Sequence, residues 1–270
     1  MKKIKVGIIG CGTIGAEIAR ACQGRLKKSV ELAAICDADE NKAAQLFKIL
    51  NKKARVLKLN ELIKKCDFVV EAASAKISAD ILKKCIKSNK RCLVMSVGGL
   101  LGNEKLLESA RSKGVKVYIP SGAICGIDGL KSASIGKVES VTITTRKPPR
   151  GLAGAPYLVE KDIDVAGLKE ETVIFEGTAA DAVKGFPQNI NVSAVLSIAG
   201  IGSGHTRVRI VASPDCSSNI HEIEIVGEFG KITMRAENVP SKTNPKTSAL
   251  AIFSAIATLE GALSSVRVGT

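Results

Sequence analysis

The chain has 270 residues, of which 45% are hydrophobic and 24% are charged. A chain of this length can bury a sizeable core and folds as one large domain or two modest ones. The composition fits a soluble globular protein, and no apolar run is long enough to cross a bilayer. We therefore expect no membrane partner.

The net charge of +14 lies entirely in the first 120 residues, which hold 25 Lys and Arg against 11 Asp and Glu. Residues 121–270 hold 15 of each kind. Such an excess could serve nucleic-acid binding. However, only 3% of the residues are aromatic, and no base-stacking or groove-reading motif is present. We interpret the excess as a solvated, lysine-rich surface that attracts small anions, and we expect no nucleic-acid partner.

The cysteines and the N-terminus indicate a reducing compartment. The eight cysteines form no C-x-x-C pair and have no histidine close in sequence, so we expect no metal site. Most lie in apolar patterns, as reduced core thiols do. The start of the chain superficially resembles a secretory signal, but Gly10 and Gly12 interrupt it and no cleavage site follows. We therefore expect a cytoplasmic protein.

Strands and helices are expected to alternate over the first 120 residues. Apolar and β-branched runs predict strands at 4–9, 30–36, 55–59, 67–71, 91–95 and 115–119. Helical spacing predicts helices at 14–22, 40–50, 60–65 (capped by Asn60), 78–88 and 103–113. This alternation indicates parallel βαβ units with right-handed crossovers. The predicted fold class is α/β, with a Rossmann-type doubly wound parallel sheet.

A glycine-rich turn directly follows the first strand. It has the pattern G-x-G-x-x-G, formed by Gly10, Cys11, Gly12, Thr13, Ile14 and Gly15. The first glycine allows a tight turn, the second lets the backbone approach a pyrophosphate, and the third lets helix and strand pack closely. The helix N-terminus then offers free N–H groups to the phosphates. The turn therefore predicts a dinucleotide site.

Two further features support this site. Asp37 ends the second strand, 22 residues past Gly15, where an acidic residue is expected to bind the adenosine ribose. Its charge disfavours a 2′-phosphate, so we expect NAD, with NADP possible because many lysines lie nearby. The fourth strand ends in small residues that leave room for the cofactor at the carboxyl end of the sheet, and we expect Ala73 and Ser74 to bind it.

The pattern changes after residue 120. Ser121, Gly122 and Ala123 begin a glycine-rich turn that could be a domain linker, a backbone cradle beside the nicotinamide, or both. Strands are then predicted at 139–146, 172–176, 206–212, 220–226 and 231–237, and helices at 178–184, 190–198 and 245–263. Consecutive strands indicate a second α+β domain for substrate binding and dimerisation. We expect a dinucleotide-binding domain at 1–120, a substrate domain at 121–244, and a C-terminal segment, 245–270, that packs back on the first domain.

The reaction of a nicotinamide enzyme also needs a group that transfers protons. The chain has two histidines, His205 and His221, each of which starts a predicted strand. Spacing alone does not choose between them, and a lysine could also serve. Arg146, Lys147 and Arg150 surround a Pro-Pro turn, where they could bind a carboxylate or simply be solvated.

Longer segments across the whole chain resemble the L-aspartate dehydrogenase family. The segments that carry the resemblance are 10–15, 121–129, 145–149, 186–194, 207–214, 219–223 and 244–248. Among them, Phe-Pro-x-Asn-Ile-Asn-Val at 186–192 and Asn-Pro-Lys-Thr-Ser at 244–248 are far more specific than the glycine-rich turn. The loop 200–204 departs from the family, and His205 matches no family role.

The resemblance implies oxidation of L-aspartate with NAD or NADP to iminoaspartate, which feeds NAD biosynthesis or hydrolyses to oxaloacetate and ammonia. It places the catalytic histidine at His221 and cofactor contacts at the glycine-rich turn, Ala123 and Asn189. It also implies a homodimer. Arg146, Lys147 and Asn189 are candidates for holding the two substrate carboxylates.

Two alternatives stay open from the sequence. The first is a related two-domain reductase that acts on homoserine or dihydrodipicolinate. The second is an NAD-binding regulator without turnover, which uses the basic half of the chain on nucleic acid.

Overall fold

The computed structural model describes residues 3–187 and 190–270, and the chain forms two compact units. The first unit comprises Met1–Pro120 together with Ile252–Val266. The second comprises Ser121–Ala251 together with Arg267–Thr270. The chain therefore passes from one unit to the other three times.

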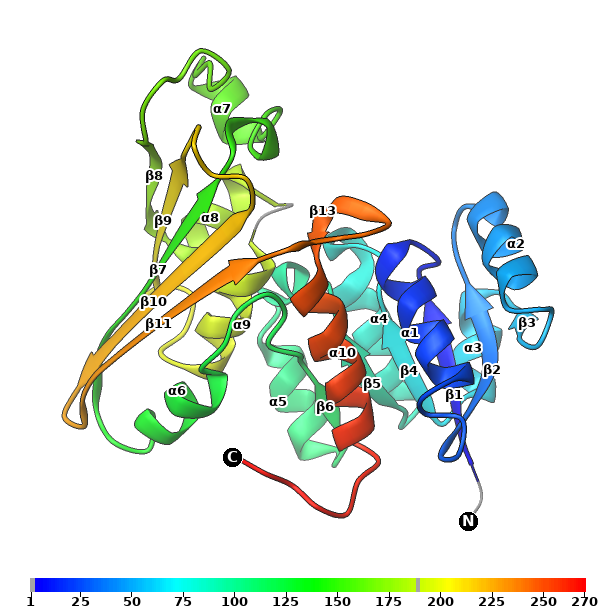
Figure 1. Ribbon diagram of the computed structural model, residues 1–270. Coiled ribbons are helices and arrows are strands. Elements are labelled where there is room, and N and C mark those ends of the chain that lie inside the picture. Colours follow the sequence, from blue (N-terminus) through cyan, green and yellow to red (C-terminus); the bar gives the residue numbers. More distant parts are fainter. Residues whose placement is uncertain (1–2, 188–189) are drawn as a thin grey trace. The chain divides into compact units, whose positions relative to one another are not determined.

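The first unit contains a six-stranded parallel sheet with helices between successive strands (Figure 1). The strand order is β3-β2-β1-β4-β5-β6, and every neighbouring pair is parallel. The strands are β1 (Ile4–Ile9), β2 (Val30–Cys36), β3 (Arg55–Val56), β4 (Phe68–Glu71), β5 (Arg91–Val94) and β6 (Val117–Tyr118). The helices are α1 (Thr13–Gln23), α2 (Glu40–Ile49), α3 (Leu59–Lys65), α4 (Ala75–Lys87), the short η1 (Val97–Leu100) and α5 (Lys105–Ser112). This order confirms the doubly wound α/β fold expected from the sequence.

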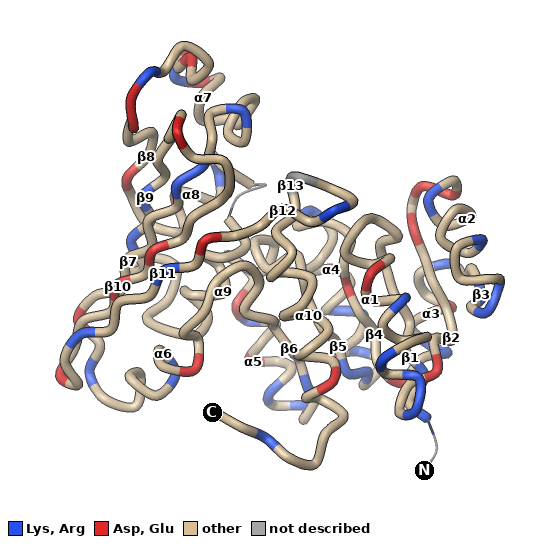
Figure 2. The backbone as a smooth tube through the Cα atoms, viewed as in Figure 1, with Lys and Arg blue, Asp and Glu red and all other residues tan. Residues whose placement is uncertain are grey.

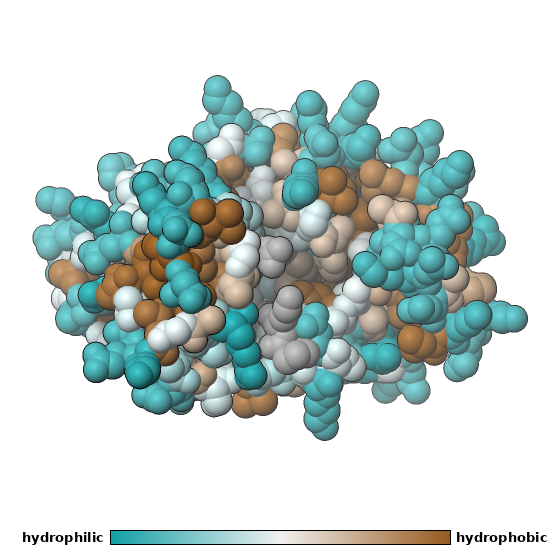
Figure 3. Space-filling model, turned by 90° about the horizontal axis from the view of Figure 1, so that it is seen from above, coloured by the Kyte–Doolittle hydropathy of each residue, from teal (hydrophilic) through white to brown (hydrophobic). Residues whose placement is uncertain are grey.

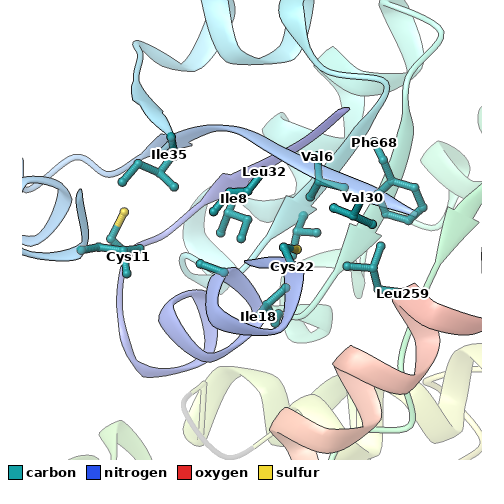
Figure 4. Packing of buried hydrophobic residues seen from close by; sticks show 14 of the residues in the cluster. Val6, Ile8, Cys11, Ile18, Cys22, Val30, Leu32, Ile35, Phe68 and Leu259 are labelled. Carbon is teal, nitrogen blue, oxygen red and sulfur yellow. The ribbon is translucent and has the colours of Figure 1, made fainter. Parts of the chain in front are cut away.

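The core of the first unit draws on both ends of the chain. Ile18 and Cys22 of α1 pack with Val6 of β1 and Phe68 of β4 in one buried cluster (Figure 4). The helix α10 (Ala249–Gly261) adds Ala255 and Leu259 to the same cluster, and neither side chain is exposed to solvent. Full burial of a leucine stabilises a fold by about 1.5–3 kcal/mol. The C-terminal helix is therefore part of the first unit's core.

The second unit is built on a five-stranded mixed sheet, in the order β11-β10-β7-β9-β8. The pair β7–β9 is parallel and the other pairs are antiparallel. The strands are β7 (Val138–Lys147), β8 (Thr172–Thr178), β9 (Arg207–Ala212), β10 (Asn219–Gly227) and β11 (Gly230–Asn238), with a small separate pair of β12 (Pro240–Ser241) and β13 (Asn244–Ser248). The helices are α6 (Ile127–Ala133), η2 (Pro149–Gly151), α7 (Pro156–Glu160), α8 (Ala179–Gly185) and α9 (Asn191–Ala199). The α+β expectation for this half is confirmed.

Several element boundaries differ from those expected. The helix α3 begins at Leu59 after Lys58, so Asn60 lies within it and does not cap it. The C-terminal helix begins at Ala249, because residues 244–248 pair with β12. The strand β7 continues through Lys147, one residue further than predicted, because Lys147 still pairs with Ala212 of β9. The helices α6 and α7 were not predicted.

Charged residues occur along both units. Lys and Arg are spread over the outer helices and loops of the first unit, including α2 and α3 (Figure 2). On the face shown in Figure 3, hydrophilic side chains cover much of the surface between smaller hydrophobic patches. No helix in the described part of the chain is long and apolar enough to cross a membrane.

Candidate active site

The glycines of the turn between β1 and α1 are present for two different reasons. Gly10 has φ +100°, and a Cβ there would lie 2.3 Å from the carbonyl oxygen of Ala72. A Cβ at Gly15 would lie 1.8 Å from the carbonyl oxygen of Gly10. Gly12 has φ −72°, and a Cβ there would meet nothing within 4 Å. The fold therefore requires Gly10 and Gly15, whereas Gly12 leaves open space at the N-terminus of α1, the position at which a helix end can bind phosphate groups.

Asp37 lies beside this turn, directly after β2. Its Oδ2 accepts a hydrogen bond from the Cys11 N–H at 2.6 Å, and its Oδ1 accepts one from the Asp39 N–H at 2.9 Å. Each carboxylate oxygen has a further lone pair, so the group can still accept from ribose hydroxyls. The carboxylate therefore links the carboxyl ends of β1 and β2 and remains able to bind a sugar.

A pocket of about 690 Å³ opens next to Asp37. Its lining is mainly apolar and includes Ile9, Phe47, Leu57 and Ile77. Ligand pockets commonly have about 300–1,000 Å³ and a few polar groups among apolar walls. The pocket lies at the carboxyl ends of β1 and β2, the place where doubly wound folds bind their ligands.

The carboxylate of Glu71 bridges the carboxyl ends of β4 and β5. Glu71 is fully buried at the end of β4, where its carboxylate accepts the N–H of Ala73 at 2.8 Å and the N–H of Ser96 at 2.9 Å. Burial raises the pKa of this carboxyl. Ser74 follows as the residue that precedes α4. The predicted cofactor residues Ala73 and Ser74 thus lie in a loop that a buried acid fixes.

The loop 121–126 lies against β11 in the second unit. Ala123 is buried, and its carbonyl accepts a hydrogen bond from Asn238 Nδ2 at 3.0 Å. A Cβ at Gly126 would lie 1.5 Å from the Met234 sulfur, so the two segments are in close contact. Asn238 Oδ1 is buried and has no hydrogen-bond partner in residues 3–187 and 190–270. Ser121, Gly122 and Ala123 therefore lie in a fixed loop beside a buried acceptor.

One end of the second unit's sheet carries a buried polar group on an otherwise apolar face. The face begins with side chains such as Val141 and Ile143 on β7. Two pleats further along are Thr145 and Lys147, and His221 on β10 pairs directly with Thr145. Asn238 shares this face, because its partner Asn219 is two residues from His221. We call Thr145, Lys147, His221 and Asn238 the polar group.

His221 is the centre of the polar group. Its side chain is 3% exposed, and its Nδ1 is 2.9 Å from the hydroxyl oxygen of Thr145. Burial, with a smaller contribution from the Lys147 charge, lowers the pKa of His221 to about 3. Burial also lowers the pKa of Lys147 to about 8. At neutral pH the imidazole is therefore uncharged and the lysine is mainly charged. The lysine loses its proton at a lower pH than an exposed lysine does.

The structure separates the other candidate side chains from this group. Arg146 points to the opposite face of β7, where it forms ion pairs with Glu171 at 3.0 Å and with Glu222. The predicted cluster of Arg146 with Lys147 is therefore not formed, because adjacent strand residues point to opposite faces. Arg150 and His205 are exposed. Asn189 lies outside the described residues.

The residues that sequence reasoning missed are Thr145, Asn238 and Glu71. The strand register places Thr145 and Asn238 on the same face as His221. Neither residue type signals a site by itself. Glu71 was assigned to a strand, but its burial depends on the packing of the neighbouring strands. In the described part of the chain, no group of three His, Cys, Asp or Glu side chains could hold a metal ion.

Both halves of the chain match known protein families. Residues 10–120 match the NAD-binding domain of homoserine dehydrogenase, and residues 128–262 match the C-terminal domain of aspartate dehydrogenase. These matches cover the glycine-rich turn, Asp37 and the polar group.

Whole-chain relatives agree with the domain matches. An L-aspartate dehydrogenase of Methanosarcina mazei is 49% identical over 99% of this chain and 100% of its own length. An L-aspartate dehydrogenase of Bradyrhizobium diazoefficiens is 39% identical over 99% of this chain and 95% of its own. The crystal structure of aspartate dehydrogenase from Thermotoga maritima superimposes with a TM-score of 0.77 at 27% identity, covering 99% of this chain and all of the other. The resemblance found in the sequence is thus confirmed, and the chain belongs to the L-aspartate dehydrogenase family.

Proposed function

We propose that this protein oxidises L-aspartate to iminoaspartate with NAD or NADP as the hydride acceptor. Iminoaspartate then hydrolyses to oxaloacetate and ammonia, or serves NAD biosynthesis. The observation that carries the proposal is the buried polar group around His221, in a chain whose other unit has a dinucleotide-binding turn. The whole-chain relatives named L-aspartate dehydrogenase support the choice of substrate.

The residues of the first unit fit a dinucleotide. The turn formed by Gly10, Cys11, Gly12, Thr13, Ile14 and Gly15 would hold the pyrophosphate at the start of α1. Asp37 would bind the adenosine ribose, and its negative charge favours NAD over NADP. We extend the cofactor site to Ala73 and Ser74, and in the second unit to Ser121, Gly122, Ala123 and Asn189. The bound cofactor supplies the hydride acceptor.

The polar group would meet the substrate. His221 is its catalytic residue, which hydrogen-bonds or transfers protons to the reacting groups, and the Lys147 ammonium suits one of the two carboxylates of aspartate. We leave Arg146 out of the substrate site, because Glu171 and Glu222 already neutralise it on the other face of the sheet. Asn189 stays a candidate carboxylate ligand from the resemblance.

The test follows NADH absorbance with the purified protein, NAD and L-aspartate. Homoserine, glutamate, alanine and malate serve as alternative substrates. A rise with aspartate supports the proposal, whereas a rise with homoserine alone would favour the related reductase. No rise with any of them, despite NAD binding, would favour the regulator without turnover.

The matched variants are His221→Asn and His205→Asn. Loss of a group that transfers a proton, or that donates a hydrogen bond to developing charge, typically lowers turnover by about 10²–10⁴-fold. We expect this loss in the first variant and none in the second, because His205 is an exposed side chain outside the polar group. Equal turnover in both variants, with NAD affinity intact, would remove His221 from the mechanism.

We also propose that the protein is a cytoplasmic homodimer. The resemblance to the family supports the dimer, and the free cysteines, most of them buried, suit a reducing compartment. Size-exclusion chromatography with light scattering tests the dimer directly.

A further inference from the structure

We propose that Thr145 holds His221 as the neutral tautomer with its proton on Nε2, so that the ring meets the substrate as a hydrogen-bond donor. Thr145 is then a positioning residue for the reaction. The part of this inference that concerns catalysis rests on the proposed function. The part that concerns the tautomer rests on the geometry of the second unit alone.

The Thr145 hydroxyl has a single hydrogen that it can donate. Thr145 is 3% exposed, so bulk solvent hardly reaches its side chain. Within the described residues, the hydroxyl contacts one polar atom, His221 Nδ1, at 2.9 Å. If Nδ1 carried the ring proton, the hydroxyl oxygen would accept a hydrogen bond from Nδ1–H. The hydroxyl hydrogen would then be buried without an acceptor.

The other tautomer satisfies every donor at this contact. With Nδ1 unprotonated, the hydroxyl donates its hydrogen to the ring nitrogen, and the ring proton is on Nε2. A buried donor without a partner costs about 1–3 kcal/mol, so the tautomer with Nε2–H is favoured. The Thr145 hydroxyl therefore occupies the lone pair of Nδ1 and leaves Nε2–H for another partner.

The surroundings keep the ring uncharged. Val141 and Ile143 precede Thr145 on the same face of β7, and Ile223 follows His221 on β10. Apolar neighbours disfavour a charged ring, and the charged Lys147 disfavours it further. Consistent with this, the pKa of His221 lies far below its ordinary value. Double protonation, which would break the hydroxyl-to-Nδ1 bond, is therefore unfavourable at neutral pH.

This assignment changes the chemistry expected of His221. A neutral imidazole with Nε2–H donates a hydrogen bond to an oxygen, such as a carboxylate or the carbonyl oxygen of oxaloacetate. It does not accept the proton that leaves the substrate ammonium, because neither ring nitrogen offers a free lone pair. That proton passes to water or to another amine.

The tautomer can be read by NMR without any turnover. The chain has two histidines, so a protein labelled with ¹⁵N-histidine gives two sets of ring signals, and His205→Asn assigns them. Long-range ¹H–¹⁵N spectra distinguish a protonated ring nitrogen from an unprotonated one. We expect His221 to show an unprotonated Nδ1 and a protonated Nε2. A protonated Nδ1 in the unaltered protein would overturn the proposal.

Three variants test the role of the hydroxyl. Thr145→Val removes it with little change in shape, and Thr145→Ser retains it. Thr144→Val is the matched control, because Thr144 lies next to it on the opposite face of β7. We expect Thr145→Val to lose the tautomer preference, while Thr145→Ser and Thr144→Val retain it.

Turnover should follow the tautomer. Loss of one hydrogen bond corresponds to a decrease in kcat of about tenfold, and we expect this for Thr145→Val with the KM for NAD unchanged. Unchanged kcat in Thr145→Val, with His221→Asn inactive, would refute the positioning role and leave the proposed function intact. Full activity of His221→Asn would instead refute the function assigned to the site.

Discussion

The replacement Gly12→Ala separates what the fold requires from what a dinucleotide requires. A Cβ at this position would meet no protein atom within 4 Å, and φ is −72°, which alanine adopts readily. Alanine is a poorer N-cap than glycine by roughly 0.5–1 kcal/mol. However, it also reduces the entropy of the unfolded chain, which is worth about 0.4–1 kcal/mol in the opposite direction. We therefore expect almost no change in stability without cofactor.

The effect on cofactor binding should be large. The Cβ would occupy the space through which a pyrophosphate approaches the start of α1. Hydrogen bonds to charged groups contribute about 1.5–3 kcal/mol, so their loss raises the Kd for NAD by roughly 10–150-fold. At a concentration of 100 Kd, NAD stabilises the unaltered protein by about 2.7 kcal/mol. If the Kd rises 100-fold, this value falls to about 0.4 kcal/mol.

Thermal unfolding with and without NAD measures both effects. For a protein of this size, about 2.7 kcal/mol corresponds to a rise in Tm of roughly 5–10 °C, whereas the variant should gain only about 1 °C. Gly15→Ala is the contrasting variant, because its Cβ would lie 1.8 Å from the Gly10 carbonyl oxygen. It should be destabilised even without NAD. An unaltered response to NAD in Gly12→Ala would refute the assignment of the open space to the pyrophosphate.

Three further outcomes follow from the side chains described above. Lys147 releases its proton near pH 8 in the folded chain but near 10.5 in the unfolded chain, so this one group raises the free energy of unfolding with pH across the window by up to about 3 kcal/mol. Buried cysteines such as Cys22 and Cys66, whose pKa is raised, act in the opposite direction, so the quantity to measure is the difference between the unaltered protein and Lys147→Met. Denaturant titrations at the two ends of the window should show this difference change in favour of the unaltered protein by that amount. Arg146→Met removes partly exposed ion pairs on the other face of the sheet. It should therefore cost at most about 1 kcal/mol of stability and leave kcat within about threefold. A loss of kcat comparable to that of His221→Asn would return Arg146 to the site. Glu71→Gln turns a carboxamide N–H toward one of the two backbone N–H groups that the carboxylate now accepts. The free energy of unfolding in urea should therefore fall by about 1–3 kcal/mol. An unchanged unfolding midpoint would contradict this account.

Most of the first unit could be predicted because its signals are local. Buried parallel strands such as β1 and β4 form continuous apolar runs, and the glycine-rich turn has fixed spacing. The boundaries were less predictable where tertiary contacts decide them. The segment 244–248 pairs with β12 and so delays the start of the last helix, and no local pattern signals that pairing.

The site was predictable only in part, because its members meet through strand register. His221 was chosen by resemblance, since spacing alone left His205 equally possible. Thr145 and Asn238 join His221 because residues paired across three strands share one face. Arg146 and Lys147 are adjacent in the sequence but lie on opposite faces. A strand one residue longer than expected places Lys147, and not Arg146, beside the histidine.

The contribution of α10 to the first unit has a consequence for how the protein is made. Leu259 and Ala255 are the last pieces of a core that begins with Val6, and Glu260 pairs with Arg25 across 235 positions of the chain. The first 120 residues leave the ribosome long before these partners do. At about 5–20 residues per second, roughly 7–30 seconds of synthesis separate Pro120 from the last helix. During that time the apolar side chains that later pack against Ala255 and Leu259 lack these partners, so we expect the first unit to complete its folding only when translation is nearly finished.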